Sequence, residues 1–198
     1  MADDSRRRAG EVVLKPIALD LCCGLGGWTA GLKAAGFEVW GFDINERFRA
    51  DYPGDRFYCC DVRIAAASLE DLGRVRRGCV VVASPPCEEF SRWQMPWTRR
   101  RNPPIPDLSI WDACEHIARE LALPIVVENV RMAQHWKGRA AWHCGSYYLW
   151  GSVPALMPTI KHRKKELMSS TWQAERAVVP FDLAYHIGCC FHPSGYGH

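Results

Sequence analysis

The sequence lacks any hydrophobic run long enough to cross a bilayer, and its polar start, "MADDSRRRAGEVVLKP", lacks the apolar centre of a secretory signal. It also contains no internal repeat and no low-complexity segment. These absences argue against secreted, membrane-spanning and repeat proteins. At 198 residues the chain fits one ordinary domain, so we expect a flexible tail over residues 1–15 and a single domain over residues 16–198.

A strong net charge is absent as well. The 25 lysines and arginines against 22 aspartates and glutamates give +3, which neither requires nor excludes a nucleic-acid partner. The 10 cysteines lack the spacing of a zinc site, because three pairs of them are adjacent in sequence. They fall within apolar runs, which is typical of buried, reduced thiols, so we expect neither a disulfide framework nor a metal centre.

Short apolar runs alternate with segments of helical pattern along the chain. The apolar runs predict strands over residues 16–23, 37–44, 57–62, 79–84 and 123–130. The helical patterns predict helices over residues 28–36 and 109–122. Strands that alternate with helices form a mainly parallel sheet flanked by helices, so we predict an α/β, Rossmann-like fold.

A glycine-rich stretch, "DLCCGLGGWTAGL", follows the first predicted strand and opens a helix. Backbone amides at such a turn can approach a nucleotide-like ligand. The stretch fails as a dinucleotide fingerprint, because Thr29 stands where glycine or alanine is expected, and this weakens a nicotinamide-dependent oxidoreductase as an alternative. Asp43 and Asp61 end the next two strands, where they could contact a ribose and an adenine amino group. Together these features predict an adenosyl cofactor lying across the strand ends.

The fourth predicted strand ends in "SPPCEEFS", which presents one thiol after a rigid Pro-Pro corner. This placement makes Cys87 a candidate nucleophile. A cysteine phosphatase is a poor alternative. Its phosphate loop needs five residues between Cys and Arg, whereas Cys87 and Arg92 have four between them, and the acids Glu88 and Glu89 would repel a phosphate.

The motifs "DLCCGLGGWTAGL", "GFDIN", "CDV", "SPPCEEFS" and "ENV" occur in this order, and with them the chain resembles the DNA cytosine-5 methyltransferases, most of all the small phage-type members. A sixth piece, "ERAVVPFDLAYHI", is similar to the last conserved helix of that family, which completes the cofactor pocket. The resemblance implies a Rossmann-like S-adenosylmethionine-dependent methyltransferase fold. It also implies methyl transfer from S-adenosyl-L-methionine to carbon 5 of cytosine in DNA, and a cytoplasmic location in a bacterial or phage-infected host cell.

The resemblance also assigns roles to individual residues. It implies that Cys87 forms the covalent bond to cytosine, and that Glu128, with Asn129 beside it, completes the catalytic group. The residues implied to bind the cofactor are Asp20, Cys22, Gly24, Leu25, Gly26, Gly27, Trp28, Asp43, Ile44, Asp61, Val62 and Pro85. Basic clusters interleaved with tryptophans suit a polynucleotide, and the expected DNA-binding residues are Ser91, Arg92, Arg99, Arg100, Arg101, Arg163 and Lys164.

The chemistry sets requirements for the two main residues. A thiolate must add to carbon 6 of a cytosine flipped out of the duplex, which requires Cys87 to be exposed and its pKa to be lowered. Glu128 would contact ring nitrogen 3 and the exocyclic amine, and a raised pKa would let its carboxyl donate a proton there.

The chain departs from the family pattern in three places. Cys22 stands where an aromatic residue usually packs against adenine, and the arginine motif of the active site is not recognisable, with Arg131, Arg139 and Arg163 as candidates. The target-recognition segment is short, around residues 149–172, which implies a short target or help from a protein partner. A related fold that uses another donor, another nucleic acid or a free nucleotide, and a non-catalytic DNA-binding relative, therefore stay open as alternatives.

Overall fold

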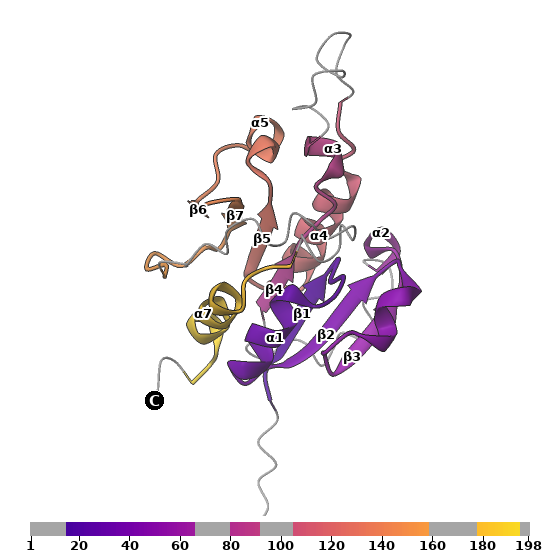
Figure 1. Cartoon of the computed structure of the whole chain (residues 1–198), viewed down its shortest axis with the longest axis vertical. Helices are drawn as coiled ribbons and strands as arrows, with labels where there is room; N and C mark the ends of the chain where they lie inside the picture. The colour runs from indigo at the N-terminus through magenta and orange to yellow at the C-terminus, as the bar shows by residue number, and fades with distance from the viewer. Residues whose placement is uncertain (1–14, 66–79, 92–104, 159–177, 195–198) are drawn as a thin grey trace, which may run out of the picture.

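The computed structural model describes residues 15–65, 80–91, 105–158 and 178–194, which form one seven-stranded sheet with helices on both faces (Figure 1). The strand order is β3-β2-β1-β4-β5-β7-β6. The parallel strands are β1 (Ile17–Leu21), β2 (Glu38–Asp43), β3 (Arg56–Cys59), β4 (Val80–Ala83) and β5 (Ile125–Asn129). The antiparallel hairpin at the edge is β6 (Trp142–Cys144) and β7 (Tyr147–Gly151).

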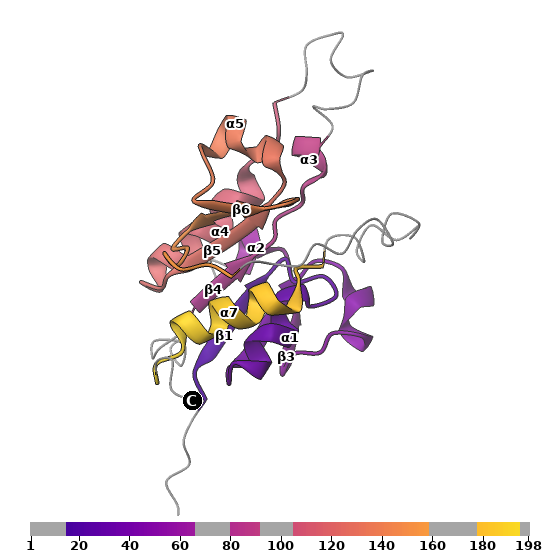
Figure 2. The ribbon, with the colours of Figure 1, turned by 60° about the vertical axis from the view of Figure 1, so that its left-hand side comes forward.

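Two long helices cover one face of the sheet and a third covers the other (Figure 2). These are α1 (Gly27–Ala34) and α7 (Phe181–Phe191) on one face, and α4 (Ser109–Glu120) on the other. The shorter helices are η1 (Glu46–Ala50), α2 (Val62–Ala65), α3 (Glu88–Ser91), η4 (Arg131–Ala133) and α5 (Gln134–Lys137). Within the described residues, no helix has the length and apolar character needed to span a membrane.

This arrangement confirms the predicted fold class, a Rossmann-like α/β fold with a mainly parallel sheet flanked by helices. Each of the five predicted strands is present, although β3 ends at Cys59, so that Asp61 lies at the start of α2 instead of ending a strand. The β6–β7 hairpin was not predicted from the sequence. Its strand β7 takes up residues 149–151, the first part of the expected target-recognition segment, and the part of that segment from residue 159 onward lies outside the described residues.

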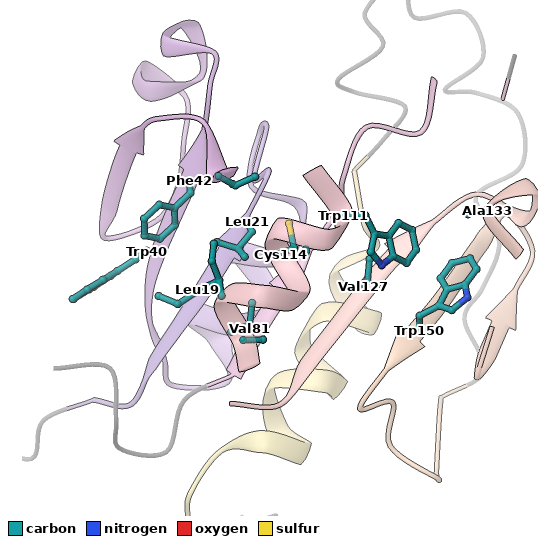
Figure 3. Packing of buried hydrophobic residues seen from close by; sticks show 14 of the residues in the cluster. Leu19, Leu21, Trp40, Phe42, Val81, Trp111, Cys114, Val127, Ala133 and Trp150 are labelled. Atoms are coloured by element: carbon teal, nitrogen blue, oxygen red, sulfur yellow. The ribbon is translucent and has the colours of Figure 1, made fainter. Parts of the chain in front are cut away.

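The core divides into two layers because side chains of a strand alternate between the faces of a sheet. In β1, Ala18 packs with α1 and α7, whereas Leu19 and Leu21 pack with α4. Figure 3 shows the second layer, in which the Trp111 ring of α4 meets the Trp150 ring of β7 edge to face at 5.2 Å between centroids. The edge hairpin is thus fastened to the core by a large aromatic contact, which is among the strongest sources of burial energy.

Glycine in α1 lets α7 approach closely. A Cβ atom at Gly31 would lie 2.4 Å from the backbone nitrogen of Tyr185, and a Cβ at Gly27 would lie 2.5 Å from that of Val179. Real side chains cannot make such short contacts, so the two helices pack at this distance only with glycine at both positions. The close packing brings residues 178–180, which precede α7, against the start of α1.

Candidate active site

The loops that carry the sequence motifs lie at one edge of the sheet. β1 and β4 are neighbours, and the chain continues from β1 to β2 and β3 on one side but from β4 to β5 on the other. Ligands of open α/β sheets bind beyond the carboxyl ends of the strands at such a topological switch point. The glycine turn follows β1, the Pro-Cys loop follows β4 and the "ENV" motif ends β5, so the fold brings the three motifs together.

The glycine turn is held open by left-handed backbone conformations. Gly24 has φ of 51° and Gly26 has φ of 77°, values that side chains other than glycine rarely adopt. The Gly24 amide donates to Asp43 Oδ2 at 2.9 Å, while Asp43 Oδ1 accepts from the Asn45 amide at 2.9 Å. A Cβ at Gly24 would meet no atom of the described residues within 4 Å, so this part of the chain leaves space above the turn for a ligand.

Asp20 is a fully buried acid beside this turn. The Thr29 hydroxyl donates to its Oδ2 at 2.6 Å and is also hydrogen-bonded to the Tyr52 hydroxyl at 2.8 Å. Its other oxygen, Oδ1, has no hydrogen-bond partner among the described residues. Burial, with a smaller contribution from Asp43, raises the pKa of Asp20 from 3.8 to about 8. A buried acceptor without a partner fits a ligand that brings a cationic or amino group to this position.

Only some of the residues expected to contact the adenosyl group are free to do so. Ile44 follows Asp43 and is 68% exposed, which leaves an apolar surface free next to the strand end. Asp61, by contrast, already binds Arg63 of the helix that follows it. Its carboxylate accepts a hydrogen bond from the Arg63 amide at 2.9 Å and forms an ion pair with the Arg63 guanidinium at 2.5 Å. These contacts lower the pKa of Asp61. The Val62 side chain is buried in the core.

The remaining cofactor candidates lie close to the turn. Cys22 has φ of 57°, and its thiol is hydrogen-bonded to Cys114 of α4. It therefore faces α4 and does not replace the aromatic contact that the family usually makes with adenine. Leu25 and Gly27 are half-buried, whereas Trp28 is buried and its indole makes a hydrogen bond to Ser84.

The nucleophile loop is fixed from the neighbouring strand. The side-chain amide of Asn129, which is 1% exposed, donates to the Pro85 carbonyl at 2.9 Å, and its oxygen accepts from the Val130 amide at 2.8 Å. Pro85 is itself buried. Asn129 thus acts on the loop that carries Cys87, and its contacts are those of a positioning residue.

Cys87 is half-buried, and the expectation that its pKa is lowered is wrong for this structure. Burial raises the pKa of the thiol, and the charges of Glu128 and Glu88 add to this effect. A backbone amide and the Ser91 hydroxyl act in the opposite direction. Ser91, expected to bind DNA, therefore contacts the thiol. The sequence did not predict the shift because the acid on β5 faces the thiol only in the folded sheet.

Glu128 is linked to the glycine turn through one hydroxyl. The Trp28 indole Nε1 of α1 donates to Ser84 Oγ at 3.0 Å, and Ser84 is also hydrogen-bonded to the Glu128 carboxyl. Burial raises the pKa of Glu128 from 4.5 to about 8, although the Ser84 hydrogen bond opposes the rise. The acid is therefore mostly protonated at neutral pH, as the sequence analysis required. Burial raises the pKa of the half-buried Tyr147 of β7, and the charge of the nearby Glu128 adds to the rise.

Most of the residues expected to bind DNA are not among the described residues. Arg92, Arg99, Arg100, Arg101, Arg163 and Lys164 lie outside the described residues. Of the three arginines considered for the active site, Arg163 is among these, while Arg131 and Arg139 both line one pocket beside β6 and β7.

Comparisons with known proteins give distant likenesses only. No protein-family model matches the chain, and no curated protein matches its sequence. Among solved structures, it is similar to a protein described as a DNA modification methyltransferase encoded within an E. coli prophage, with 21% identity, a TM-score of 0.43, and coverage of 61% of this chain and 34% of the other. It is also similar to the Dnmt2 methyltransferase of S. pombe, with 21% identity, a TM-score of 0.44, and coverage of 62% and 36%.

The chain thus spans about a third of the length of these solved structures.

Three residues of the site were not predicted from the sequence. In the sequence, Ser84 ends an apolar run and Thr29 departs from a dinucleotide fingerprint, and neither feature by itself indicates a site residue. Tyr52 lies in an irregular segment without any pattern. The alternation of side chains along a strand could have indicated Ser84, because Ser84 and Glu128 continue the register that pairs Val82 with Val126. No signal in the sequence indicates Tyr52.

Proposed function

We propose that the protein transfers a methyl group from S-adenosyl-L-methionine to carbon 5 of a cytosine in DNA. The observation that carries this proposal is the Trp28–Ser84–Glu128 chain of contacts. It links the glycine turn, where an adenosyl ligand would bind, to a protonated acid on the strand next to the Cys87 loop. A thiol, a neutral acid and a nucleotide turn at one switch point fit cytosine chemistry better than phosphate or hydride transfer.

The residues at the turn fit the proposed cofactor. Asp20 offers a buried oxygen without a partner, Asp43 a carboxylate at the end of β2, and Ile44 an exposed apolar surface. When bound, S-adenosyl-L-methionine supplies an electrophilic methyl group on a cationic sulfur. The pKa of about 8 keeps Asp20 mostly neutral until a positive group approaches, and the negative charge then compensates that group.

The side chains of this protein would act on the base in a defined order. The Cys87 thiolate forms a bond to carbon 6 of cytosine while the Glu128 carboxyl donates a proton to ring nitrogen 3, which makes carbon 5 nucleophilic. After carbon 5 has been methylated, loss of its proton and return of the electron pair expel the thiolate, and Glu128 recovers its proton from nitrogen 3. Asn129 holds the loop so that Cys87 needs little reordering when the base arrives.

Formation of the thiolate depends on the state of Glu128. Burial is the main cause of the raised pKa of Cys87 and the negative charge of Glu128 is the second, and a protonated Glu128 removes the second cause. The Ser91 hydroxyl and a backbone amide then favour the thiolate. The protonated acid thus supports both its own proton donation and the ionisation of its neighbour.

The proposed partner is DNA from which the target cytosine is flipped out, because the base cannot reach Cys87 inside a duplex. Residues 159–172 and the basic clusters would supply target recognition and phosphate contacts, with a further protein partner where these are insufficient. A cytoplasmic location in a bacterial or phage-infected cell follows from this role.

Mass spectrometry of nucleosides tests the proposal. Unmethylated duplex DNA is incubated with the protein and S-adenosyl-L-methionine, beside a Cys87→Ala control. We expect a 5-methyl-deoxycytidine signal that the control lacks. The proposal is wrong if calorimetry shows that the cofactor binds while neither duplex nor single-stranded DNA gains the modified base.

A further inference from the structure

A polar pocket lies on the edge of the molecule beyond β5. It has a volume of about 480 Å³ and is bordered by η4, α5 and the β6–β7 hairpin, which lie together in Figures 1 and 2. This volume lies in the range of roughly 300–1,000 Å³ typical of ligand pockets. The lining residues are Arg131, Gln134, Arg139, Ala140, Ala141, Trp142, His143 and Tyr148.

The loop that forms one wall of this pocket is fixed by hydrogen bonds. The Trp150 indole donates to the Gly138 carbonyl at 2.9 Å, and the Ala140 amide donates to Gln134 Oε1 at 3.1 Å. The Ala141 amide donates to the Leu149 carbonyl at 2.8 Å. Arg139 therefore extends from a backbone that is held on both sides, which reduces the ordering cost of binding a ligand.

The charges of the pocket are positive and uncompensated. None of its lining residues is acidic, and within the described ranges neither the Arg131 guanidinium nor the Arg139 guanidinium makes a hydrogen bond or an ion pair. The nearby Lys137 differs, since its ammonium contacts Asp112 at 3.0 Å and Glu115 at 2.9 Å. Two free guanidinium groups on one pocket favour a phosphate, which accepts paired hydrogen bonds from arginine.

The pocket also contains a flat aromatic surface. The rings of His143 and Tyr148 stack with centroids 4.9 Å apart and an interplanar angle of 13°. His143 is exposed, so the face of its ring that is turned away from Tyr148 is open to a further ring. Stacked rings beside arginines are typical of sites that bind single nucleotides of a strand.

The position of the pocket connects it to the candidate active site. Arg131 comes three residues after Glu128 in the sequence, and Tyr148 is the β7 neighbour of Asn129, which holds the nucleophile loop. Trp136 of α5 packs on Phe90 of α3, 5.9 Å between ring centroids, so the helix that follows Cys87 and the helix that borders the pocket are in contact.

We propose that this pocket is a second nucleotide subsite, which binds the phosphate and base of a nucleotide that neighbours the target cytosine in DNA. The guanidinium groups of Arg131 and Arg139 bind the phosphate, and the His143 ring stacks on the base. The inference rests on the proposed function for the identity of the strand, and it assigns a specificity role to residues outside the catalytic group.

Equilibrium binding tests the phosphate contacts. The probe is a fluorescein-labelled single-stranded oligonucleotide, followed by anisotropy over a salt series, with Cys87→Ser in every protein so that no covalent adduct forms. We expect Arg131→Ala and Arg139→Ala each to weaken binding about tenfold and to lower the salt slope by about 0.7. Arg119→Ala, on an exposed position of α4, is the matched control and should change binding less than about twofold. Equal effects of all three variants would overturn the proposal.

Two further experiments test whether His143 stacks on the base and whether the bound nucleotide belongs to DNA. His143→Ala should weaken binding about fivefold to tenfold, and His143→Phe, which keeps a stacking face, should restore it. A His143→Ala variant that binds like the parent would refute stacking. Free deoxycytidine monophosphate is added as a competitor. If it displaces the oligonucleotide at equal concentration, the pocket serves free nucleotides and the assignment to DNA is wrong.

The two proposals fail separately. Binding of S-adenosyl-L-methionine and formation of 5-methyl-deoxycytidine by the unmodified protein test the proposed function without the pocket variants. The arginine variants should keep the thermal midpoint and the cofactor affinity of the parent, because the pocket is distinct from the glycine turn. Loss of either in Arg131→Ala and Arg139→Ala would contradict a separate subsite.

Discussion

The substitution Asp20→Asn should stabilise the protein without ligand while weakening its cofactor site. Asp20 is fully buried and its pKa is raised to about 8, whereas an unfolded chain would ionise it at 3.8. Between these values the folded state holds a proton that the unfolded state has lost, so the stability of the wild type falls as pH rises. Asparagine carries no proton to lose, and the variant lacks this dependence.

The magnitude follows from linkage. Each pH unit between the two pKa values costs the wild type about 1.4 kcal/mol, and allowing for partial ionisation the change from about pH 5 to about pH 7 is ~2.5 kcal/mol. The buried amide of the variant gains a donor without a partner at the position of Oδ1, which costs about 1–3 kcal/mol at every pH. The absolute difference is therefore small near pH 5 and favours the variant near pH 7.

Urea unfolding at several pH values measures this difference. For a chain of this size the midpoint of the variant relative to wild type should rise by about 1 M from about pH 5 to about pH 7. The same substitution at the exposed Asp51 serves as a control for the general effect of removing a carboxylate. A relative midpoint that stays constant over this interval would refute the buried, protonated Asp20. Calorimetry should show that Asp20→Asn weakens S-adenosyl-L-methionine binding about tenfold or more, because the charge that compensates the cation is lost.

Three further changes probe the rest of the site. Ser84→Ala removes the hydrogen bond that lowers the pKa of Glu128, so the alkaline limb of the pH–rate profile should move to a pH higher by about half a unit to one unit. An unchanged alkaline limb would show that Glu128 is not the proton donor. Asn129→Ala should lower kcat at least tenfold with cofactor affinity unchanged, and retained turnover would show that Cys87 is positioned without it. Gly31→Ala should lower the unfolding free energy by about 1–3 kcal/mol in urea titrations, and a neutral result would contradict the close packing of α1 and α7.

The sequence predicts the strand ends of this site well because local patterns determine them. Apolar runs followed by glycines or prolines place Asp20 and Cys87 at one edge of the sheet, and the end of a further apolar run places Asp43 there, before any contact is known. It predicts less well what depends on packing between segments distant in the chain. Burial raises the pKa of Cys87 and the charge of Glu128 on another strand adds to the rise, while Asp61 forms an ion pair with Arg63 beyond the end of β3 at Cys59.

The β6–β7 hairpin illustrates the same limit. Leu149 and Trp150 of β7 are buried, but no pattern in the sequence indicates that Trp142–Cys144 pairs with this strand. Short strands joined by Gly145 and its neighbour carry little periodicity, and the hairpin is held at the edge by the pairing of β7 with β5 and by the contact between Trp111 and Trp150. This hairpin forms one border of the pocket that Arg131 and Arg139 line.

Two acids on the same face of the sheet, the buried Asp20 and the half-buried Glu128, perform opposite tasks in the proposed mechanism. Asp20 and Glu128 alternate with Leu19 and Val127, which face α4, so both point toward α1 and α7, and burial raises both pKa values to about 8. A cationic ligand beside Asp20 favours its ionised form, whereas a base that accepts a hydrogen bond favours protonated Glu128. Cofactor binding should therefore release close to one proton at neutral pH and DNA binding none. Calorimetry in buffers of different ionisation enthalpy measures both numbers, and a proton released on DNA binding would contradict proton donation by Glu128.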